Sequence, residues 1–134
     1  MLRFARRRAW LAYVRLKPHL LPFGWAIAGL RRAVRTEGHL RLHLAAAGAV
    51  VAAGVLLRLS PLEWAVLWLA IGLVITAEVA NTAVELAVDV ASRDPHPLAG
   101  AAKDVAAGAV LVASLTAALV GLCLFGPKVL ALFG

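Results

Sequence analysis

Residues 64–91 read WAVLWLAIGLVITAEVANTAVELAVDVA, an apolar stretch that carries three carboxylates and an asparagine in its second half. The first half has no charged residue and is typical of a membrane-spanning helix. On a helix with about 100° per residue, Asn81, Glu85 and Asp89 lie within about 60° of Glu78. The four polar side chains therefore share one narrow stripe of an otherwise apolar helix.

An acidic side chain at membrane depth is costly, so it usually faces protein or water and usually has a function. Glu78 is the deepest of the three acids because it follows directly on the uncharged stretch. The stripe is therefore the strongest functional indication in the chain.

Composition places the chain in a membrane. Of its 134 residues, 63% are hydrophobic, and the mean hydropathy is +0.88. Soluble domains are about 45–50% apolar. A single soluble core of this size could not bury so much apolar surface, whereas a bilayer can. The single cysteine, Cys123, excludes a disulfide framework within one chain.

Positive charge is concentrated at the start of the chain. The net charge is +7, and ten of the fourteen Lys and Arg residues lie in residues 1–41. Beside membrane spans, such a segment indicates a cytoplasmic face near anionic lipid rather than a nucleic-acid site. Residues 1–16 lack the long apolar core of a signal peptide, so we expect a basic amphipathic segment on the membrane surface.

The rest of the chain predicts an all-α integral membrane protein with one domain over residues 1–134. A turn at residues 58–61 has Ser60 as a helix N-cap and Pro61 at the first helical position. Prolines and an aspartate mark a second loop near residues 92–97. The predicted segments are basic surface helices within 1–38, the second of them at 20–38, and transmembrane helices at 39–58, 62–91 and 98–125.

The charge distribution predicts a cytoplasmic N-terminus. Three crossings then place the loop near residues 92–100 inside and the C-terminus outside. The polar groups expected at the inner face are Glu37, Glu85, Asp89, Asp94, His96, Lys103 and Asp104. Carboxylates, a lysine and an amide suit a phosphate with its divalent cation, because Mg²⁺ takes one or two carboxylates together with substrate phosphates.

Simpler interpretations remain open on these grounds. Glu85 and Asp89 could form helix-end ion pairs with Lys103 and Arg93, and Glu78 could bond a neighbouring helix. The histidines at 19, 39 and 43 are expected at the membrane interface, without a zinc-binding spacing. There is no nucleotide-binding G-x-x-x-x-G-K-[ST] loop. These observations do not separate a kinase from a small proton- or ion-conducting oligomer that uses Glu78 as a relay.

Two motifs make the interpretation more specific. AEVANTAVELAVD at 77–89 and HPLAGAAKDVAAGAVL at 96–111 closely resemble the signature of the small prokaryotic diacylglycerol kinase family, which includes undecaprenol kinases. The pattern is E-x-x-N-[ST]-A-x-E-x-x-x-D, followed after about fourteen residues by A-K-D. FGWAIAGL at 23–30 and Glu37 also match, so the resemblance covers about residues 23–120.

The resemblance implies a homotrimer of three-span protomers in the bacterial inner or plasma membrane that phosphorylates a lipid alcohol with Mg-ATP. Glu78 matches the general base, and Glu37 and Glu85 match the metal-binding acids. Asp89 matches a position with a mainly structural role. The residues that match nucleotide or phosphate contacts are Trp25, Asn81, Asp94, Pro95, His96, Lys103 and Asp104, together with Glu37 and Glu85.

Departures within the motif bear on the lipid acceptor. The diacylglycerol branch typically has a Gln-Glu pair shortly after the first acid. Here the chain reads EGHLRLHL at 37–44, closer to the R-x-H-L of the undecaprenol branch. The resemblance therefore favours undecaprenol over diacylglycerol, whose phosphorylation gives phosphatidic acid, and implies direct in-line transfer at the cytoplasmic face.

Overall fold

The computed structural model describes residues 21–92 and 96–133, and every regular element in them is an α-helix. The expected surface segment at residues 1–16 lies outside this part of the chain. The chain divides into two compact units, residues 1–32 and 33–134. The all-helical fold with three long apolar helices is confirmed.

Helix α2 (Leu21–Thr36) corresponds to the expected surface helix at 20–38. Its apolar residues Phe23, Ile27 and Leu30, which recur at helical spacing, are exposed. An exposed apolar stripe flanked by arginines is typical of a helix that lies in a membrane interface.

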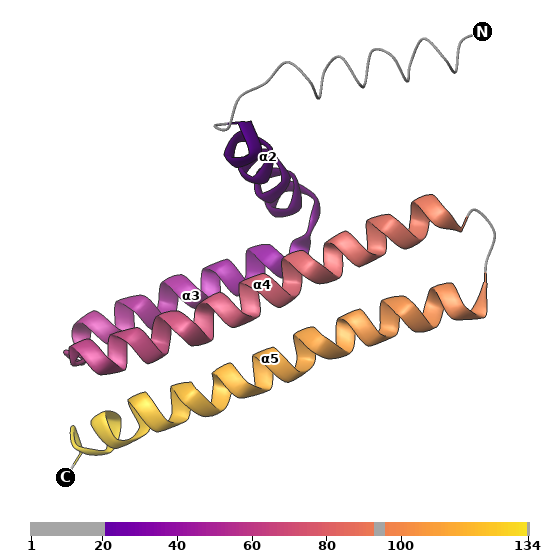
Figure 1. Cartoon of the computed structure of the whole chain (residues 1–134). Coiled ribbons are helices and arrows are strands. Elements are labelled where there is room, and N and C mark those ends of the chain that lie inside the picture. The colour runs from indigo at the N-terminus through magenta and orange to yellow at the C-terminus, as the bar shows by residue number, and fades with distance from the viewer. Residues whose placement is uncertain (1–20, 93–95, 134) are drawn as a thin grey trace, which may run out of the picture. The chain divides into compact units, whose positions relative to one another are not determined.

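Three helices make up the second unit: α3 (Gly38–Leu56), α4 (Pro61–Ala91) and α5 (Pro97–Leu130). All three are long and apolar enough to cross a membrane. Consecutive helices run in opposite directions, and α4 packs against both α3 and α5 (Figure 1). At 1.5 Å per residue, α4 and α5 are about 46 and 51 Å long, so both exceed a hydrocarbon core of about 30 Å.

The turn between α3 and α4 is fixed by local hydrogen bonds. The Ser60 side chain accepts a hydrogen bond from the backbone N–H of Glu63, whose carboxylate accepts one from the Ser60 N–H at 2.6 Å. This is the expected N-cap, extended to a full capping box, with Pro61 in the first helical turn. Arg58 adopts a left-handed conformation (φ 52°) that lets the chain reverse direction.

Helix α5 continues past the expected end at Phe125 and includes Pro127. Proline lacks an N–H but still accepts hydrogen bonds, and the Pro127 carbonyl accepts from the N–H of Ala131 at 3.1 Å. Beyond it, Lys128 pairs with Glu63 on α4, with 3.1 Å between Nζ and Oε1. This contact connects the far ends of α4 and α5.

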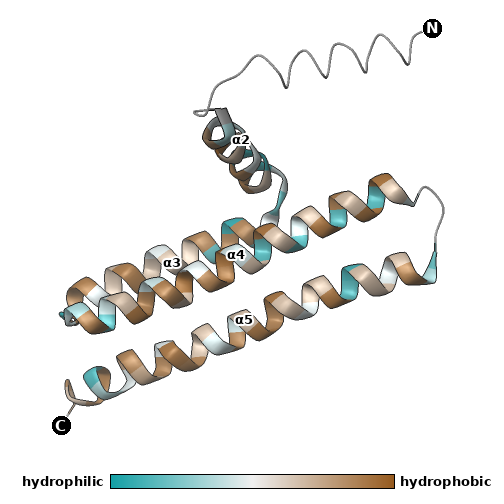
Figure 2. Cartoon of the chain, viewed as in Figure 1, coloured by the Kyte–Doolittle hydropathy of each residue, from teal (hydrophilic) through white to brown (hydrophobic). Residues whose placement is uncertain are grey.

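Most of the surface of the three long helices is not covered by the chain itself. In the most apolar part of each helix, 11% of the residues of α3, 22% of α4 and 6% of α5 are buried. Hydrophilic residues gather where α4 and α5 approach their connecting loop, whereas the middle of each helix is apolar (Figure 2). Such surfaces are suited to contact with lipid or with other subunits.

Candidate active site

Glu78 is buried where α4 packs against α3. It lies on α4 with only 5% of its surface exposed, and Thr82 is the other buried polar residue in the described part of the chain. His43 on α3 contacts it, with 3.1 Å between His43 Nε2 and Glu78 Oε1. The Thr82 hydroxyl donates to the backbone oxygen of Glu78 rather than to its carboxylate. The carboxylate that the resemblance predicts to be the base therefore contacts a histidine from the neighbouring helix.

Asn81 and Glu85 form a second polar pair, one turn nearer the loop. Asn81 Nδ2 donates to Glu85 Oε1 at 2.9 Å. The other end of the amide, Asn81 Oδ1, is buried and has no hydrogen-bond partner. A buried polar atom without a partner is costly, so this oxygen is available to a ligand that the chain itself does not supply.

Lys103 on α5 pairs with Asp89 on α4, and this ion pair lies next to the loop between the two helices. The contact agrees with the expected structural role of Asp89 and with the expected helix-end ion pair. Asp104, the neighbour of Lys103, is exposed. Lys103 is half-exposed, so a nucleotide phosphate could still approach its ammonium group.

The remaining predicted site residues are more scattered. His96 caps α5, and its Nδ1 accepts a hydrogen bond from the N–H of Leu98 at 3.2 Å. The Glu37 carboxylate accepts from the Thr36 hydroxyl at 2.9 Å, just before α3 begins. Trp25 lies on α2, in the first unit. Asp94 and Pro95 lie outside the described residues.

The fit of these residues to Mg²⁺ can be judged from their donor atoms. In the described residues, no three His, Cys, Asp or Glu side chains lie together as a metal site would require. Mg²⁺ bound with a nucleotide needs only one or two carboxylates, because phosphates and water complete its shell. Glu85, with the partnerless oxygen of Asn81 beside it, fits that requirement.

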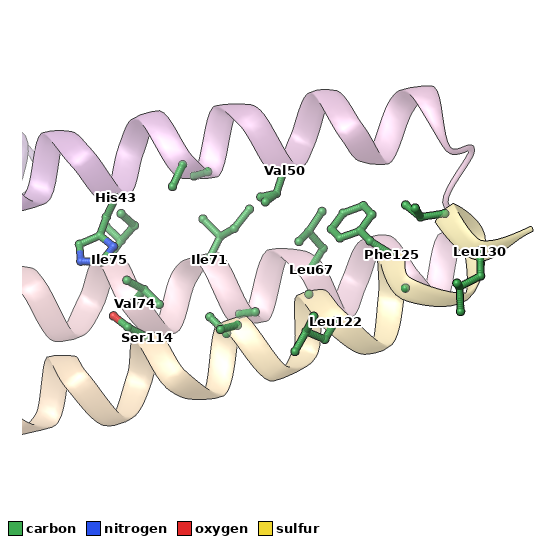
Figure 3. Close-up of a pocket in the computed structure, with 18 residues that line it drawn as sticks. His43, Val50, Leu67, Ile71, Val74, Ile75, Ser114, Leu122, Phe125 and Leu130 are labelled. Carbon is green, nitrogen blue, oxygen red and sulfur yellow. The ribbon is translucent and has the colours of Figure 1, made fainter. Parts of the chain in front are cut away.

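An apolar groove of about 860 Å³ runs between α3, α4 and α5. It is lined by apolar side chains except for His43 and Ser114. Figure 3 shows His43 at one end of the groove and Leu130 at the other, with Ile71, Val74 and Phe125 between them. The groove therefore ends at the histidine that contacts Glu78.

Comparison with known proteins identifies the family of the chain. The prokaryotic diacylglycerol kinase family matches residues 24–125, about three quarters of the chain. The chain belongs to this family. It is similar to an undecaprenol kinase of Bacillus subtilis, with 45% identity over 100 residues that cover 75% of this chain and 81% of the relative. It is also similar to a diacylglycerol kinase of Synechocystis, with 42% identity over 129 residues that cover 95% of this chain and 71% of the relative.

As a member of the prokaryotic diacylglycerol kinase family, the protein is a multi-pass membrane lipid kinase that carries out ATP-dependent phosphorylation. The predicted family and enzyme class are confirmed. The ion-conducting alternative therefore loses its support.

Sequence reasoning missed the contact between His43 and Glu78, because His43 was expected only at the membrane interface. The one available signal was spacing along the helices. His43 lies 13 residues before the end of α3 at Leu56, and Glu78 lies 17 residues after the start of α4 at Pro61. Measured from the shared turn, the two residues therefore lie within about one helical turn of the same depth. Whether they also face each other depends on how the helices pack.

Proposed function

We propose that this protein transfers the γ-phosphoryl group of Mg-ATP directly to the hydroxyl of a membrane lipid, with undecaprenol as the favoured acceptor and Glu78 as the general base. The observation that carries the proposal is the position of Glu78. It is a buried carboxylate that contacts His43, and His43 lines the end of an apolar groove. A lipid alcohol needs this combination, since its chain requires apolar surface and its hydroxyl requires a proton acceptor.

The chemistry assigns Glu78 a limited task. Its carboxylate takes the proton of the lipid hydroxyl as the oxygen forms a bond to the γ-phosphorus. The bond between that phosphorus and the bridging oxygen of ADP breaks in line, ADP leaves, and the proton stays on Glu78 until solvent removes it. Phosphoryl transfer otherwise depends on position and charge, so most of the remaining residues bind rather than react.

We assign the nucleotide to the polar end of α4 and α5. Glu85 and Glu37 would hold Mg²⁺, which would offset the negative charge of the phosphates. Asn81 donates a hydrogen bond to Glu85, and its buried amide oxygen has no partner and is available to the nucleotide or its metal. Lys103 places a cation near the phosphates. Contacts to the rest of the nucleotide are assigned to Trp25, Asp94, Pro95, His96 and Asp104.

The preference for undecaprenol rests on two observations. The segment Arg41-Leu42-His43-Leu44 follows the R-x-H-L pattern of the undecaprenol branch. The relative named undecaprenol kinase is 45% identical, and the one named diacylglycerol kinase 42%. Because the two identities differ so little, the main support is the Arg41–Leu44 segment. This segment contains His43, which contacts Glu78.

We also propose that the enzyme works as a homotrimer in the bacterial inner membrane with its N-terminus in the cytoplasm. The positive charge of residues 1–41 supports this orientation. It places the loop end of α4 and α5 on the side where ATP is available. The sparse burial of all three long helices supports assembly with other copies.

A competition assay tests the acceptor. Purified protein in vesicles that contain equal amounts of undecaprenol and diacylglycerol is supplied with labelled Mg-ATP, and the ratio of the two kcat/KM values is measured. We expect undecaprenol to be phosphorylated faster. A clear preference for diacylglycerol would show that the acceptor is wrongly assigned but would leave the kinase activity standing. No transfer to either lipid would contradict the proposed kinase activity.

A further inference from the structure

The contact between His43 and Glu78 connects α3 and α4 at the proposed base. We propose that His43 is a positioning residue for the reaction, whose Nε2–H holds one oxygen of the Glu78 carboxylate and leaves the other to take the proton of the lipid hydroxyl. This inference rests on the proposed function, in which Glu78 is the base.

Burial makes the contact important for the base. The Glu78 side chain is 7% exposed, so water does little to solvate or orient it. A buried carboxylate needs a hydrogen-bond donor, and a glutamate side chain with several rotatable bonds needs one to stay in a single conformation. Thr82 does not supply this donor, because its hydroxyl bonds the backbone oxygen of Glu78. The donor to the Glu78 carboxylate is His43.

The atoms assign the direction of the hydrogen bond. An ionised carboxylate only accepts, so the proton in this contact belongs to His43 Nε2. The imidazole is 25% exposed and lines the end of the apolar groove. His43 therefore touches both the base and the space that we assign to the lipid, which is where a residue that aligns the two must lie.

Two other roles could explain the same contact. His43 could merely fasten α3 to α4, as polar pairs between membrane helices often do. It could also carry the proton away from Glu78. Glutamine separates proton transfer from positioning, because its amide nitrogen lies about where Nε2 lies in histidine and donates a hydrogen bond but does not take up or release a proton in the reaction. Fastening is separated by the double variant with Glu78→Gln, in which loss of a mere contact between helices would slow the residual rate further.

The experiment compares His43→Leu, His43→Gln and a matched control in the full-length protein, reconstituted in vesicles with undecaprenol and Mg-ATP. The control is His39→Leu, which removes an exposed histidine one turn earlier on α3. Leucine at 43 should lower kcat at least about tenfold while the KM for Mg-ATP stays unchanged, because a misplaced base slows transfer without affecting nucleotide binding. Glutamine should restore kcat to within about threefold of the original enzyme. The control should match the original enzyme.

The contrary results are specific. If His43→Leu keeps the original kcat, or if His43→Gln is as slow as His43→Leu, His43 does not position the base. If the leucine variant fails to fold, His43→Asn serves instead, since its shorter side chain does not reach Glu78. A folded asparagine variant with the original kcat would likewise overturn the inference.

Glu78→Gln separates this inference from the function on which it rests. If Glu78→Gln keeps full turnover, the base is wrongly assigned and the role of His43 falls with it. If Glu78→Gln is inactive and His43→Leu keeps the original kcat, Glu78 remains assigned as the base and only the role of His43 is wrong. If His43 acts through Glu78, adding His43→Leu to Glu78→Gln should slow the residual rate less than about twofold.

Discussion

Lys103 on α5 forms an ion pair with Asp89 on α4, and the pair closes the polar end of the two helices beside their connecting loop. The lysine that we assign to the phosphates is thus held by an acid that we do not assign to catalysis. Because the Asp89 side chain is 63% exposed, the pair is screened by water and contributes little to stability. We therefore expect Asp89 to orient Lys103 while the ammonium group still attracts the phosphates.

Substitutions at the two positions should separate their roles. Asp89→Asn should lower the free energy of unfolding by less than about 1 kcal/mol, as exposed pairs usually do. Lys103→Met should raise the KM for Mg-ATP at least about tenfold, because it removes a cation from the phosphates. Chemical unfolding measures the stability of Asp89→Asn, and ATP titrations of both variants measure the KM for Mg-ATP. An equal rise in this KM in the two variants would mean that Lys103 serves only to pair with Asp89.

Glu85→Gln should weaken the use of Mg²⁺ more than it affects the lipid. We expect the Mg²⁺ concentration for half-maximal activity to rise about tenfold. The reason is that a metal site with only one or two carboxylates loses much of its affinity when one carboxylate is removed. The matched control is Glu63→Gln, which neutralises an acid of the same helix α4 at the opposite end, where Glu63 pairs with Lys128. If both variants need the same Mg²⁺ concentration as the original enzyme, Glu85 is not a metal ligand.

Local sequence signals predicted the fold well. The cap at Ser60 and Pro61 depends on residues that are neighbours in the chain, so its pattern could be read directly. The polar stripe of α4 follows from helical spacing alone. Helix α5 continues to Leu130, beyond the expected end of the membrane span at Phe125, and Lys128 pairs with Glu63 on α4.

Contacts between helices could not be predicted in the same way. The pairs His43–Glu78 and Glu63–Lys128 join residues that are far apart in the sequence. Each depends on the rotation of one helix against another, which is set by many small apolar contacts rather than by a motif. The resemblance thus predicted Glu78 as the base, but the contact of Glu78 with His43 could be found only from the packed structure.

Gly54 is required where α3 meets the turn. A Cβ at this position would lie 2.9 Å from Leu59 Cδ1 and 3.0 Å from Trp64 Cη2. Gly54→Ala should therefore cost about 1–3 kcal/mol from overpacking, partly offset by about 1 kcal/mol of better helix propensity. Gly72→Ala is the control, because a Cβ there meets nothing within 4 Å in the described chain. Thermal unfolding in detergent compares the two, and an equal Tm would contradict the predicted clash.

Activity should require the oligomer. The small residues of α3 and α5 permit close approach of helices from other copies, which would shield polar groups that three helices alone leave near lipid. The candidate positions are Ala45, Ala46, Ala47, Gly48, Ala106, Ala107 and Gly108. Crosslinking and mass measurement in detergent should find a trimer that carries the activity. A fully active monomer would refute this prediction.

The most direct test compares phosphate transfer by the original enzyme and by Glu78→Gln, in the same vesicles with labelled Mg-ATP and a lipid alcohol. We predict that the original enzyme labels the lipid, and that Glu78→Gln lowers kcat about 10²–10⁴-fold, the usual contribution of a general base, while nucleotide affinity stays nearly unchanged. Glutamine keeps the size of the side chain, so a loss of this kind reports on the carboxylate. Near-normal transfer by Glu78→Gln, or no transfer by the original enzyme to any lipid alcohol, would contradict the proposed mechanism.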